Sequence, residues 1–502
     1  MYKKLFFFLF VPVLGISQVQ IGVDIDGDAP DDQFGYGVAM SADGSVIAVG
    51  APFNDGNGTD AGHVKVYSNA SGTWTQIGDD IEGKAAGDQS GFRVALSADG
   101  SVVAISAPYN DGNGTNSGQV RVYENISGIW TQIGNDIDGQ IAGDGFGHGM
   151  ALSANGSILA VGAPFRDGDI NGSPITDIGI IQIYQNISGV WTQIGQDIQQ
   201  NNMNGLMGCS GWYVDLSTDG MTIAIGVPKT IYGKVLIYRN ISGVWTQVGN
   251  EIVGKSNYNE ENGYRVALSA DGSVVAMGAR FNDDNGKNAG RVSIYKNVAN
   301  NWVQVGSDIY GESAGDRCSM VALSANGEVL AVGSPVSDMN GVYSGHVRIF
   351  QNISGTWVQQ GTSISGLAAG DYSGFALALS ADGTNLVIGS PKLNSTSGSS
   401  AKNAAKGIGT SHIRVYDISG ILSTNNFISE SFDVFPNPVS DILNIRMKNN
   451  LTLEKVTVYN NSGQIVKTAQ QSTVDVSNLS SGIYFVEVTT NQGIATKKVI
   501  VK

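Results

Sequence analysis

Short apolar runs, separated by glycine, asparagine and aspartate, recur along most of this 502-residue chain. In one unit near the N-terminus these runs cover residues 36–40, 46–50, 63–67 and 74–78. Runs of this length between turn-forming residues predict β-strands joined by tight turns, and the repeats contain no helical hydrophobic period. The predicted fold class is therefore all-β.

The same unit occurs seven times. A turn that begins with serine, continues through aspartate or asparagine and ends in glycine marks each copy, and these turns open at Ser41, Ser97, Ser153, Ser217, Ser269, Ser324 and Ser380. Each copy holds four strand-like runs, and repeats of this kind are typical of propeller blades. The pattern predicts a seven-bladed β-propeller.

The two ends of the repeat region complement each other. The last copy ends at residues 413–416 without its fourth run, and the missing run stands at the N-terminus as residues 19–22. A repeat divided between the two ends is typical of a closed ring. We therefore expect the N-terminal segment to pair as the outer strand of the seventh blade, which removes an open sheet edge.

Polarity predicts the order of strands within a blade. The second run is apolar on both faces, as in residues 102–105 and 158–161, so it must be covered on both sides, whereas the fourth run is the most polar. An aromatic residue or histidine stands five positions before the marker serine in most copies: Tyr36, Phe92, His148, Trp212, Tyr264 and Phe375. We expect apolar inner strands and a polar outer strand.

The chain ends differ from the repeats. Residues 1–17 combine two lysines with an apolar run and small residues, the pattern of a secretory signal peptide. We expect the propeller over 18–419, a linker over 420–430 and a separate module over 431–502. No later apolar stretch is long enough to predict a transmembrane segment in the mature chain. The formal net charge of −15 argues against a nucleic-acid partner.

Two short motifs recur in the repeats. Residues 34–35 and 50–52 read Phe-Gly and Gly-Ala-Pro, and residues 146–147 and 162–164 repeat them. Through these motifs the repeat region resembles the FG-GAP repeats of the integrin alpha-subunit propeller and its bacterial relatives. The resemblance implies a seven-bladed propeller used mainly for extracellular binding. Calcium-binding members of that family carry an acidic loop where this chain has only the tight serine turn.

The C-terminal module begins with Phe435-Pro-Asn-Pro438 and continues with apolar runs at 443–447, 456–459 and 482–488. In this order of motifs it resembles the C-terminal sorting domain (type A) of type IX secretion in certain Gram-negative bacteria. The resemblance implies a small β-sandwich that the type IX secretion machinery recognises. It also implies a protein that is secreted or displayed on the outer-membrane surface.

One face of the propeller is the expected binding face. In an antiparallel blade, loops 2→3 and 4→1 lie at the same end, and these are the longer and more varied connections, where binding usually resides. Aspartates recur in both: Asp32, Asp88, Asp144, Asp316 and Asp371 in loops 4→1, and Asp55, Asp111, Asp167, Asp283 and Asp338 in loops 2→3. One interpretation is that each aspartate caps its own turn through hydrogen bonds to backbone N–H groups.

The other interpretation is a cation site. Its best case is Asp167, Asp169 and Asn171, because alternating oxygen ligands before a glycine resemble the first half of a calcium-binding EF-hand loop. The closing glutamate of that loop is absent, and Ile178 stands in its place. Calcium is therefore a possible ligand, predicted at Asp167, Asp169 and Asn171.

Blades three and four depart most from the repeat. They contain the long loop 165–178, the polar stretch 199–209 and Asp215, which replaces an inner-strand alanine. These departures are consistent with sequence drift or with a notch that binds a partner. The only cysteines, Cys209 and Cys318, fall in different copies, so we expect buried or free thiols.

No catalytic residue is predicted. Three of the four histidines occupy the same third-strand position in different copies and should not converge: His63, His346 and His412. The preferred hypothesis is a secreted or cell-surface binding or adhesion protein whose loop face recognises an extracellular protein or glycan. The alternative is a propeller-type extracellular polysaccharide hydrolase or lyase. An enzyme should bring carboxylates or histidine together at the central channel, whereas a binder should not.

Overall fold

The computed structural model describes residues 18–170, 173–199, 208–255, 260–393, 411–422, 432–448, 452–460, 464–490 and 493–502. The chain divides into two compact units, Met1–Ile421 and Leu422–Lys502. The expected signal peptide, 1–17, and most of the expected linker, 420–430, lie outside the described residues. Among the described residues, no helix has the length and hydropathy that a membrane crossing needs.

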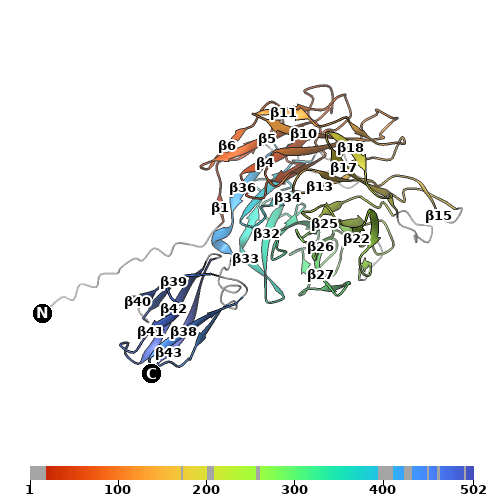
Figure 1. The fold of residues 1–502 in the computed structure, drawn as a ribbon. Coiled ribbons are helices and arrows are strands. Elements are labelled where there is room, and N and C mark those ends of the chain that lie inside the picture. Colours follow the sequence, from red (N-terminus) through yellow and green to blue (C-terminus); the bar gives the residue numbers. More distant parts are fainter. Residues whose placement is uncertain are drawn as a thin grey trace. The chain divides into compact units, whose positions relative to one another are not determined.

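The first unit contains seven antiparallel sheets of four or five strands each, one for every copy of the repeat (Figure 1). The first strands of the blades are β3 (Gly37–Met40), β8 (Arg93–Leu96), β13 (Gly149–Leu152), β20 (Val214–Leu216), β25 (Asn262–Leu268), β30 (Met320–Leu323) and β34 (Ala376–Leu379). They contact one another in chain order, and β34 contacts β3. The seven blades therefore form a closed ring around a central channel.

The second and third strands make the body of each blade. The second strands are β4 (Val46–Ala51), β9 (Val102–Ala107), β14 (Ile158–Ala163), β21 (Thr222–Val227), β26 (Val274–Ala279), β31 (Val329–Ser334) and β35 (Asn385–Ser390). The third strands are β5 (His63–Ala70), β10 (Gln119–Ile126), β17 (Ile180–Ile187), β22 (Lys234–Ile241), β27 (Arg291–Val298), β32 (His346–Ile353) and β36 (His412–Asp417). Every residue of β9, β14 and β21 is buried, as the apolar pattern of the second run predicts.

The fourth strand is divided in most blades. Its first part is β6 (Thr73–Gln76), β11 (Ile129–Gln132), β18 (Val190–Gln193), β23 (Val244–Gln247) and β28 (Asn301–Gln304). Its second part is β7 (Ile81–Glu82), β12 (Ile137–Asp138), β19 (Ile198–Gln199), β24 (Ile252–Val253) and β29 (Ile309–Tyr310). Both parts pair with the third strand. In blade six they merge into β33 (Thr356–Ser365), which carries a register shift.

The break in the outer strand has a packing reason. Gly78 adopts a φ of +70°, in the left-handed region that favours glycine, and a Cβ there would lie 2.6 Å from the carbonyl oxygen of Gly128. The kink leaves the Ile77 carbonyl free to accept a 2.8 Å hydrogen bond from the Trp130 indole N–H of the next blade. Four other tryptophans make the same bond to the preceding blade: Trp74, Trp191, Trp245 and Trp302. The repeated Trp and Ile-Gly motifs thus join neighbouring blades.

Ring closure follows the sequence prediction. Blade seven consists of β34, β35 and β36, and its outer strand comes from the N-terminus as β1 (Val19–Gln20) and β2 (Ile25–Asp26). Val19 pairs with Asp417, and Ile25 pairs with Ile413, so β1 lies beside β36 (Figure 1). A short 3₁₀ helix, η1 (Ser419–Ile421), follows β36. The prediction that the N-terminal segment completes the last blade is confirmed.

Backbone hydrogen bonds between the serine turns also close the ring of blades. The backbone N–H of Ala42 donates to the carbonyl of Ala98, and Ala98 donates in turn to Ala154, at 2.8 and 2.7 Å. The series continues through the turns of the remaining blades and returns when Ala381 donates to Ala42 at 2.8 Å. Each turn is also fixed internally, since the marker serine accepts the N–H that opens the second strand, as Ser97 does from Val102.

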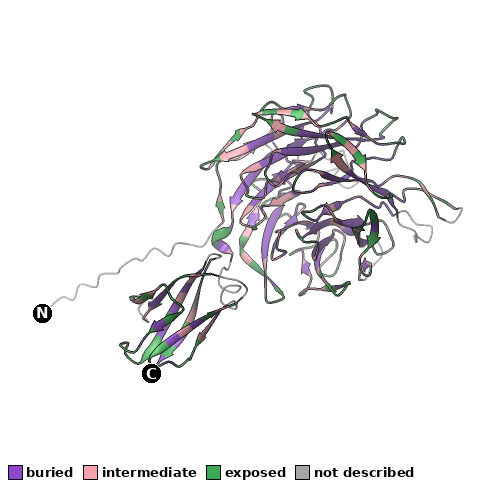
Figure 2. Ribbon diagram, viewed as in Figure 1, coloured by how far each residue is buried: buried purple, intermediate pink, exposed green. Residues whose placement is uncertain are grey.

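Burial follows the radial order of the strands. Figure 2 shows buried residues along the inner strands and exposed residues along the outer hairpins. Apolar clusters lie between adjacent blades: one joins Ala48 and Val66 of blade one to Val103 and Ile105 of blade two. Each sheet is therefore covered on both faces by its neighbours, which is why the second strands carry no polar alternation.

The second unit is a two-sheet sandwich, as predicted from the sequence. One sheet contains β37 (Phe432–Phe435), β38 (Ile442–Met447) and β41 (Thr473–Asp475). The other contains β40 (Ile465–Ala469), β39 (Leu453–Tyr459), β42 (Gly482–Thr490) and β43 (Gly493–Val501). The sheets share a core that includes Phe432 and Leu443 from the first and Val456, Val486 and Val499 from the second.

Candidate functional site

The aspartates of loops 2→3 fasten their own loops. Asp55 accepts the backbone N–H of Asp60 at 2.9 Å, and Asp111 accepts that of Asn116 at 2.8 Å. The equivalent bonds are made by Asp167, Asp283 and Asp338. The turn-capping interpretation accounts for all five of these residues.

The aspartates of loops 4→1 are also engaged locally. Asp88, Asp316 and Asp371 accept backbone N–H groups of their own loops. Asp32 accepts the Asn54 amide at 2.8 Å, and Asp144 pairs with Arg166 at 2.6 Å. The bonds of Asp32 and Asp144 hold their 4→1 loops against the neighbouring 2→3 loops, so the acids of this face have structural partners.

The predicted calcium ligands are only partly described. Asp167 precedes a small hairpin of β15 (Gly168–Ile170) and β16 (Ser173–Ile175), and Asp169 lies within β15. Asn171 lies outside the described residues. Asp167 accepts the N–H of Asp177 at 3.0 Å, which closes the base of the hairpin. Calcium at Asp167, Asp169 and Asn171 stays a prediction.

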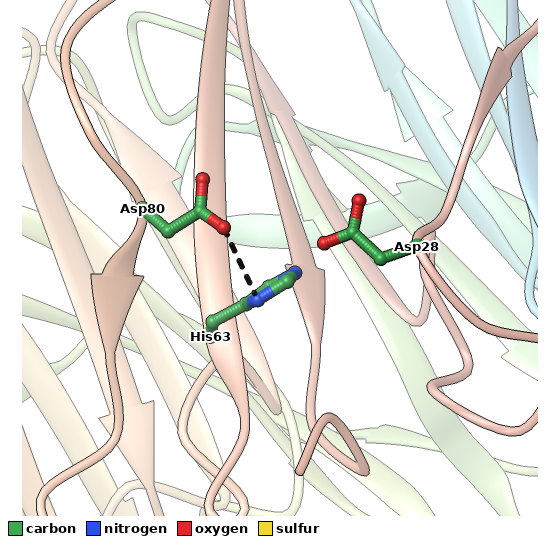
Figure 3. A group of neighbouring side chains, drawn as sticks. All are labelled: Asp28, His63 and Asp80. Carbon is green, nitrogen blue, oxygen red and sulfur yellow. Dashed lines mark ion pairs between the residues drawn. The ribbon is translucent and has the colours of Figure 1, made fainter. Parts of the chain in front are cut away.

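Only one group of three potential metal ligands occurs among the described residues, and sequence reasoning did not single it out. Asp28, His63 and Asp80 place their ligand atoms within 4.8 Å of one another (Figure 3). His63 Nδ1 lies 3.7 Å from an Asp80 carboxylate oxygen. The Lys65 ammonium lies 2.7 Å from Asp28 and 3.4 Å from Asp80, and burial lowers the pKa of His63. Because a lysine already supplies the positive charge, we interpret this group as an ion-pair network.

The histidines do not converge. His63, His346 and His412 begin the third strands of three different blades, as the sequence predicted. The fourth, His148, lies at the channel. Cys209 and Cys318 are both buried and free, which confirms the prediction for the thiols.

The central channel opens a cavity of about 310 Å³ whose wall is formed by the first strands of all seven blades. Aromatic rings surround its loop-face end. Tyr36 contacts Phe92 and Phe375 at ring-centroid distances of 5.0 and 4.9 Å, and His148 contacts Phe92 and Trp212 at 4.9 and 4.5 Å. We call Tyr36, Phe92, His148, Trp212, Tyr264 and Phe375 the aromatic collar. Blade six places Ser319 at the equivalent position and interrupts it.

Two arginines and a tyrosine meet just inside the collar. The Arg93 guanidinium carbon lies 4.3 Å from the centroid of the Tyr213 ring, and that of Arg265 lies 3.8 Å from the same ring. All three residues line the cavity. We call Arg93, Tyr213 and Arg265 the Arg–Tyr–Arg cluster. Cation–π contacts of this kind hold a guanidinium in place without neutralising it.

Neither guanidinium of the cluster has an ion-pair partner in the part of the chain that the structure describes. Arg93 donates to its neighbour's carbonyl, Phe92 O, at 3.0 Å, and its buried Nε has no hydrogen-bond partner. Arg265 donates to the Phe375 carbonyl at 3.2 Å and passes Met320, whose sulfur lies 3.1 Å from its Nε. It thereby spans the gap that Ser319 leaves in the collar.

Burial governs the titration of the surrounding groups. It lowers the pKa of Arg265, with Arg93 contributing repulsion, and it raises the pKa of Tyr36 and of Tyr213. It also lowers the pKa of His148 to about 3, so this imidazole is neutral at ordinary pH. The loop-face end of the channel therefore combines positive charge with neutral aromatic and hydroxyl groups.

Asp215 is the one carboxylate among the described residues that line the cavity. It accepts the N–H groups of Leu216 at 2.9 Å and Leu268 at 2.7 Å, and burial raises its pKa to about 6. A polysaccharide hydrolase uses two carboxylates that flank the scissile bond. The pair expected for that alternative does not occur among the described lining residues.

Sequence reasoning missed the Arg–Tyr–Arg cluster, although a signal was present. Four positions before the marker serine, the copies carry Gly37, Arg93, Gly149, Tyr213, Arg265, Met320 and Ala376. The next position is apolar in every copy and the position before it is aromatic or histidine in six of seven, so this wider variation marks a place where the repeat does not dictate the residue. The small residues leave room at the channel, and the arginines and tyrosine fill it.

Three other cations near the loop-face end form ion pairs. Lys229 and Arg280 both form ion pairs with Glu261, and Lys392 pairs with Asp371. Lys229 also lies 5.9 Å from the Trp212 ring. Much of the polar stretch 199–209 lies outside the described residues, so the predicted notch in blades three and four stays a prediction.

Fold and site thus define a repeat propeller whose channel mouth carries aromatic and arginine side chains, together with a C-terminal sandwich. A model of the FG-GAP repeat matches residues 18–67 and 82–123, and a model of the secretion system C-terminal sorting domain matches residues 433–502. The chain thus contains FG-GAP repeats within its first two blades and a type IX secretion sorting domain in its C-terminal unit, and the sorting domain indicates a secreted or cell-surface protein.

No curated protein matches the sequence. Among solved structures, Kuenenia stuttgartiensis hydrazine synthase is 13% identical with a TM-score of 0.47, covering 73% of this chain and 94% of its own. A putative 6-phosphogluconolactonase from Bacteroides uniformis is 13% identical with a TM-score of 0.45, covering 66% and 85%. The periplasmic gluconolactonase of Pseudomonas aeruginosa is 16% identical, with the same TM-score and coverage. We draw no conclusion about activity from these likenesses.

Proposed function

We propose that this protein is a binding or adhesion protein whose loop face recognises an extracellular protein or glycan. One observation carries the proposal: at this face the channel ends in aromatic rings and two guanidinium groups that have no carboxylate partner among the described residues. Pockets that bind ligands are concave, mostly apolar and equipped with a few polar groups. Aromatic and arginine side chains are also the residues that dominate binding energy at interfaces.

The surroundings of the pocket support recognition by a rigid scaffold. The loops of this face are fastened by their aspartates, and the blades beneath them form a closed ring. A site built on rigid elements loses little conformational entropy when a ligand binds. Delivery to the exterior by the sorting domain would place the ligand outside the cell, either in the medium or at the outer-membrane surface. The secretion machinery is then the partner of the C-terminal unit.

The proposal is tested by a binding screen of the chain expressed without residues 1–17. Immobilised glycans and extracellular-matrix proteins would form the panel, with and without calcium. Binding that a Tyr213→Ala variant loses, while Tyr459→Ala in the C-terminal unit retains it, would support recognition at the channel. If no panel member binds, the proposal fails.

The enzymatic alternative is decided in the same experiment. Glycans that bind would be incubated with the protein and analysed for new reducing ends and for the unsaturated ends that a lyase produces. Cleavage would replace the binding proposal with the hydrolase or lyase alternative. The single, backbone-bonded carboxylate at the described cavity wall favours binding.

A further inference from the structure

We propose that the Arg–Tyr–Arg cluster is an anion-binding subsite that takes the carboxylate or sulfate group of an acidic saccharide. The inference rests on the proposed function, because it assigns a ligand class to the same channel mouth. It follows from the charge, the burial and the surroundings of Arg93 and Arg265.

Charge is the first step. The described side chains that line the cavity include two guanidinium groups and one carboxylate, and that carboxylate, Asp215, is occupied by two backbone N–H groups. Cations nearer the rim are neutralised by loop acids, as Arg280 is by Glu261 at 2.5 Å. A protein with a net charge of −15 thus holds uncompensated positive charge at one buried place.

Burial is the second step. Arg93 is only 9% exposed, and its Nε has no hydrogen-bond partner within the described part of the chain. A buried donor without a partner costs free energy, and a buried charge costs more. The two guanidinium groups also repel each other, since Arg93 disfavours the charged form of Arg265. A bound oxyanion would satisfy the free donor and remove the repulsion.

Ligand geometry is the third step. A guanidinium presents planar, paired N–H donors that match the two oxygens of a carboxylate or sulfate, and arginine is the usual residue where such groups are recognised. Tyr213 holds both guanidinium groups against one ring, at 4.3 and 3.8 Å, which restricts their orientation before a ligand arrives. The cluster is therefore preorganised for an oxyanion.

The aromatic collar indicates which kind of molecule bears the anionic group. Tyr36, Trp212 and Phe375 of the collar are half-buried residues. Their faces offer flat apolar surfaces for the C–H face of a pyranose ring, and tyrosine hydroxyls offer hydrogen bonds to sugar hydroxyls. A cavity of about 310 Å³ lies at the lower end of the range for small-ligand pockets. We expect a terminal or single acidic sugar unit to enter it.

The test uses the chain without residues 1–17 and four probes in calorimetry. Galacturonate tetrasaccharide carries carboxylates, a sulfated galactose tetrasaccharide carries sulfates, cellotetraose is neutral, and sodium sulfate is an anion without a sugar. We expect binding of one or both acidic tetrasaccharides, weaker binding of sulfate, and none of cellotetraose. The carboxylate and sulfate probes distinguish the two sources of the anion.

The variants are Arg93→Gln and Arg265→Gln, with Arg239→Gln as the matched control because Arg239 is exposed on β22. We expect each cluster variant to weaken binding of the acidic probe by about tenfold to a hundredfold, the loss of a charge-assisted hydrogen bond. The control should bind as the unaltered protein does. Unchanged affinity in both cluster variants would overturn the inference.

A second measurement uses only the unaltered protein, so its result does not depend on whether the variants fold. Galacturonate should raise the Tm of the unaltered protein more than galactose does at equal concentration and ionic strength. An equal effect of the two sugars would count against an anion subsite. Binding only of neutral glycans or proteins would overturn this inference and leave the proposed function standing, whereas no binding in the wider screen would remove both.

Discussion

The two ends of the central channel are built from the same repeated strands but are closed in different ways. At the turn end, seven nearly identical turns are linked blade to blade by backbone hydrogen bonds. At the loop end, the repeated positions carry different residues, and the contacts are ring stacking and cation–π pairs, as between Arg93 and Tyr213.

This difference separates stability from recognition. Backbone bonds around the turn end require the same geometry in every blade, which explains why the marker serine is never replaced. Side-chain contacts at the loop end tolerate different residues, so that end can hold a ligand without compromising closure. We expect changes at the turn end to alter stability and changes at the loop end to alter binding.

The largest effect is expected from the turn end. Ser97→Ala combined with Ser269→Ala removes the acceptors of the Val102 and Val274 N–H groups. Each unsatisfied buried donor costs about 1–3 kcal/mol and distant sites add, so unfolding free energy should fall by about 2–6 kcal/mol. Denaturant unfolding measures this fall.

The matched control for the turn end is Ser101→Ala with Ser273→Ala, which changes serines of the same turns that do not accept these N–H groups. Ligand binding by the folded double variant Ser97→Ala/Ser269→Ala should be unchanged. If this double variant lost binding without losing stability, the assignment of stability to the turn end and of binding to the loop end would be wrong.

The next-largest effect is a loss of stability at acidic pH, and it is expected from His148. Its folded pKa of about 3 lies below the unfolded value, so the stability from keeping it neutral is present above pH 6.5 and is lost as the pH falls toward 3. At pH 4 the loss should reach about 3 kcal/mol. His148→Phe, which restores the residue type of blade two, should abolish this loss and leave stability at pH 7 nearly unchanged. Thermal unfolding of both proteins across this range measures it, and parallel pH curves would contradict the prediction.

Asp215 should change the free energy of unfolding with pH in the direction opposite to His148, and by a smaller amount. Its folded pKa, about 6, lies above the unfolded value, so its contribution is fully present below pH 4 and is lost as the pH rises through 6. Asp215→Ala, the residue of the other blades, should gain about 1–3 kcal/mol relative to the unaltered protein between pH 4 and pH 8. Asp55→Ala, at an exposed loop acid, should show no such gain in the same urea titrations.

The smallest effect tests calcium at the loop end. The calcium hypothesis predicts that saturating calcium raises Tm by a few degrees and that chelation reverses the shift. Asp169→Asn should remove the response, while Asp111→Asn in blade two should retain it. A Tm that does not respond to calcium in the unaltered protein would remove Asp167, Asp169 and Asn171 as a site.

The sequence allowed the ring to be predicted because its determinants are repeated. Seven marker serines and the divided last copy were sufficient for the blade count and the closure by residues 19–22, and the pairing of Val19 with Asp417 confirms that closure. The divided outer strand was not predicted, because it depends on the approach of Gly78, at φ +70°, to the next blade.

The Arg–Tyr–Arg cluster was beyond sequence reasoning for a different reason. Arg93 and Tyr213 are far apart in the chain, and they meet only because the channel brings the first strands of several blades around one axis. The aspartates of loops 2→3 cap their own turns, which explains why they recur at fixed positions. The informative residues were those that vary at a fixed position.

The pairing of the first described strand with the last blade has a consequence for how the protein is made. Blade seven lacks its outer strand until Val19 meets Asp417, so the ring cannot close before both ends of the propeller are available. Joining such distant segments carries an entropic cost that is met only at the end of folding. A chain that lacks residues 19–26 would keep β36 as an open edge, and open edges invite aggregation or capture by other chains. Pairing of β1 and β2 with β36 therefore requires that both ends of the propeller have emerged.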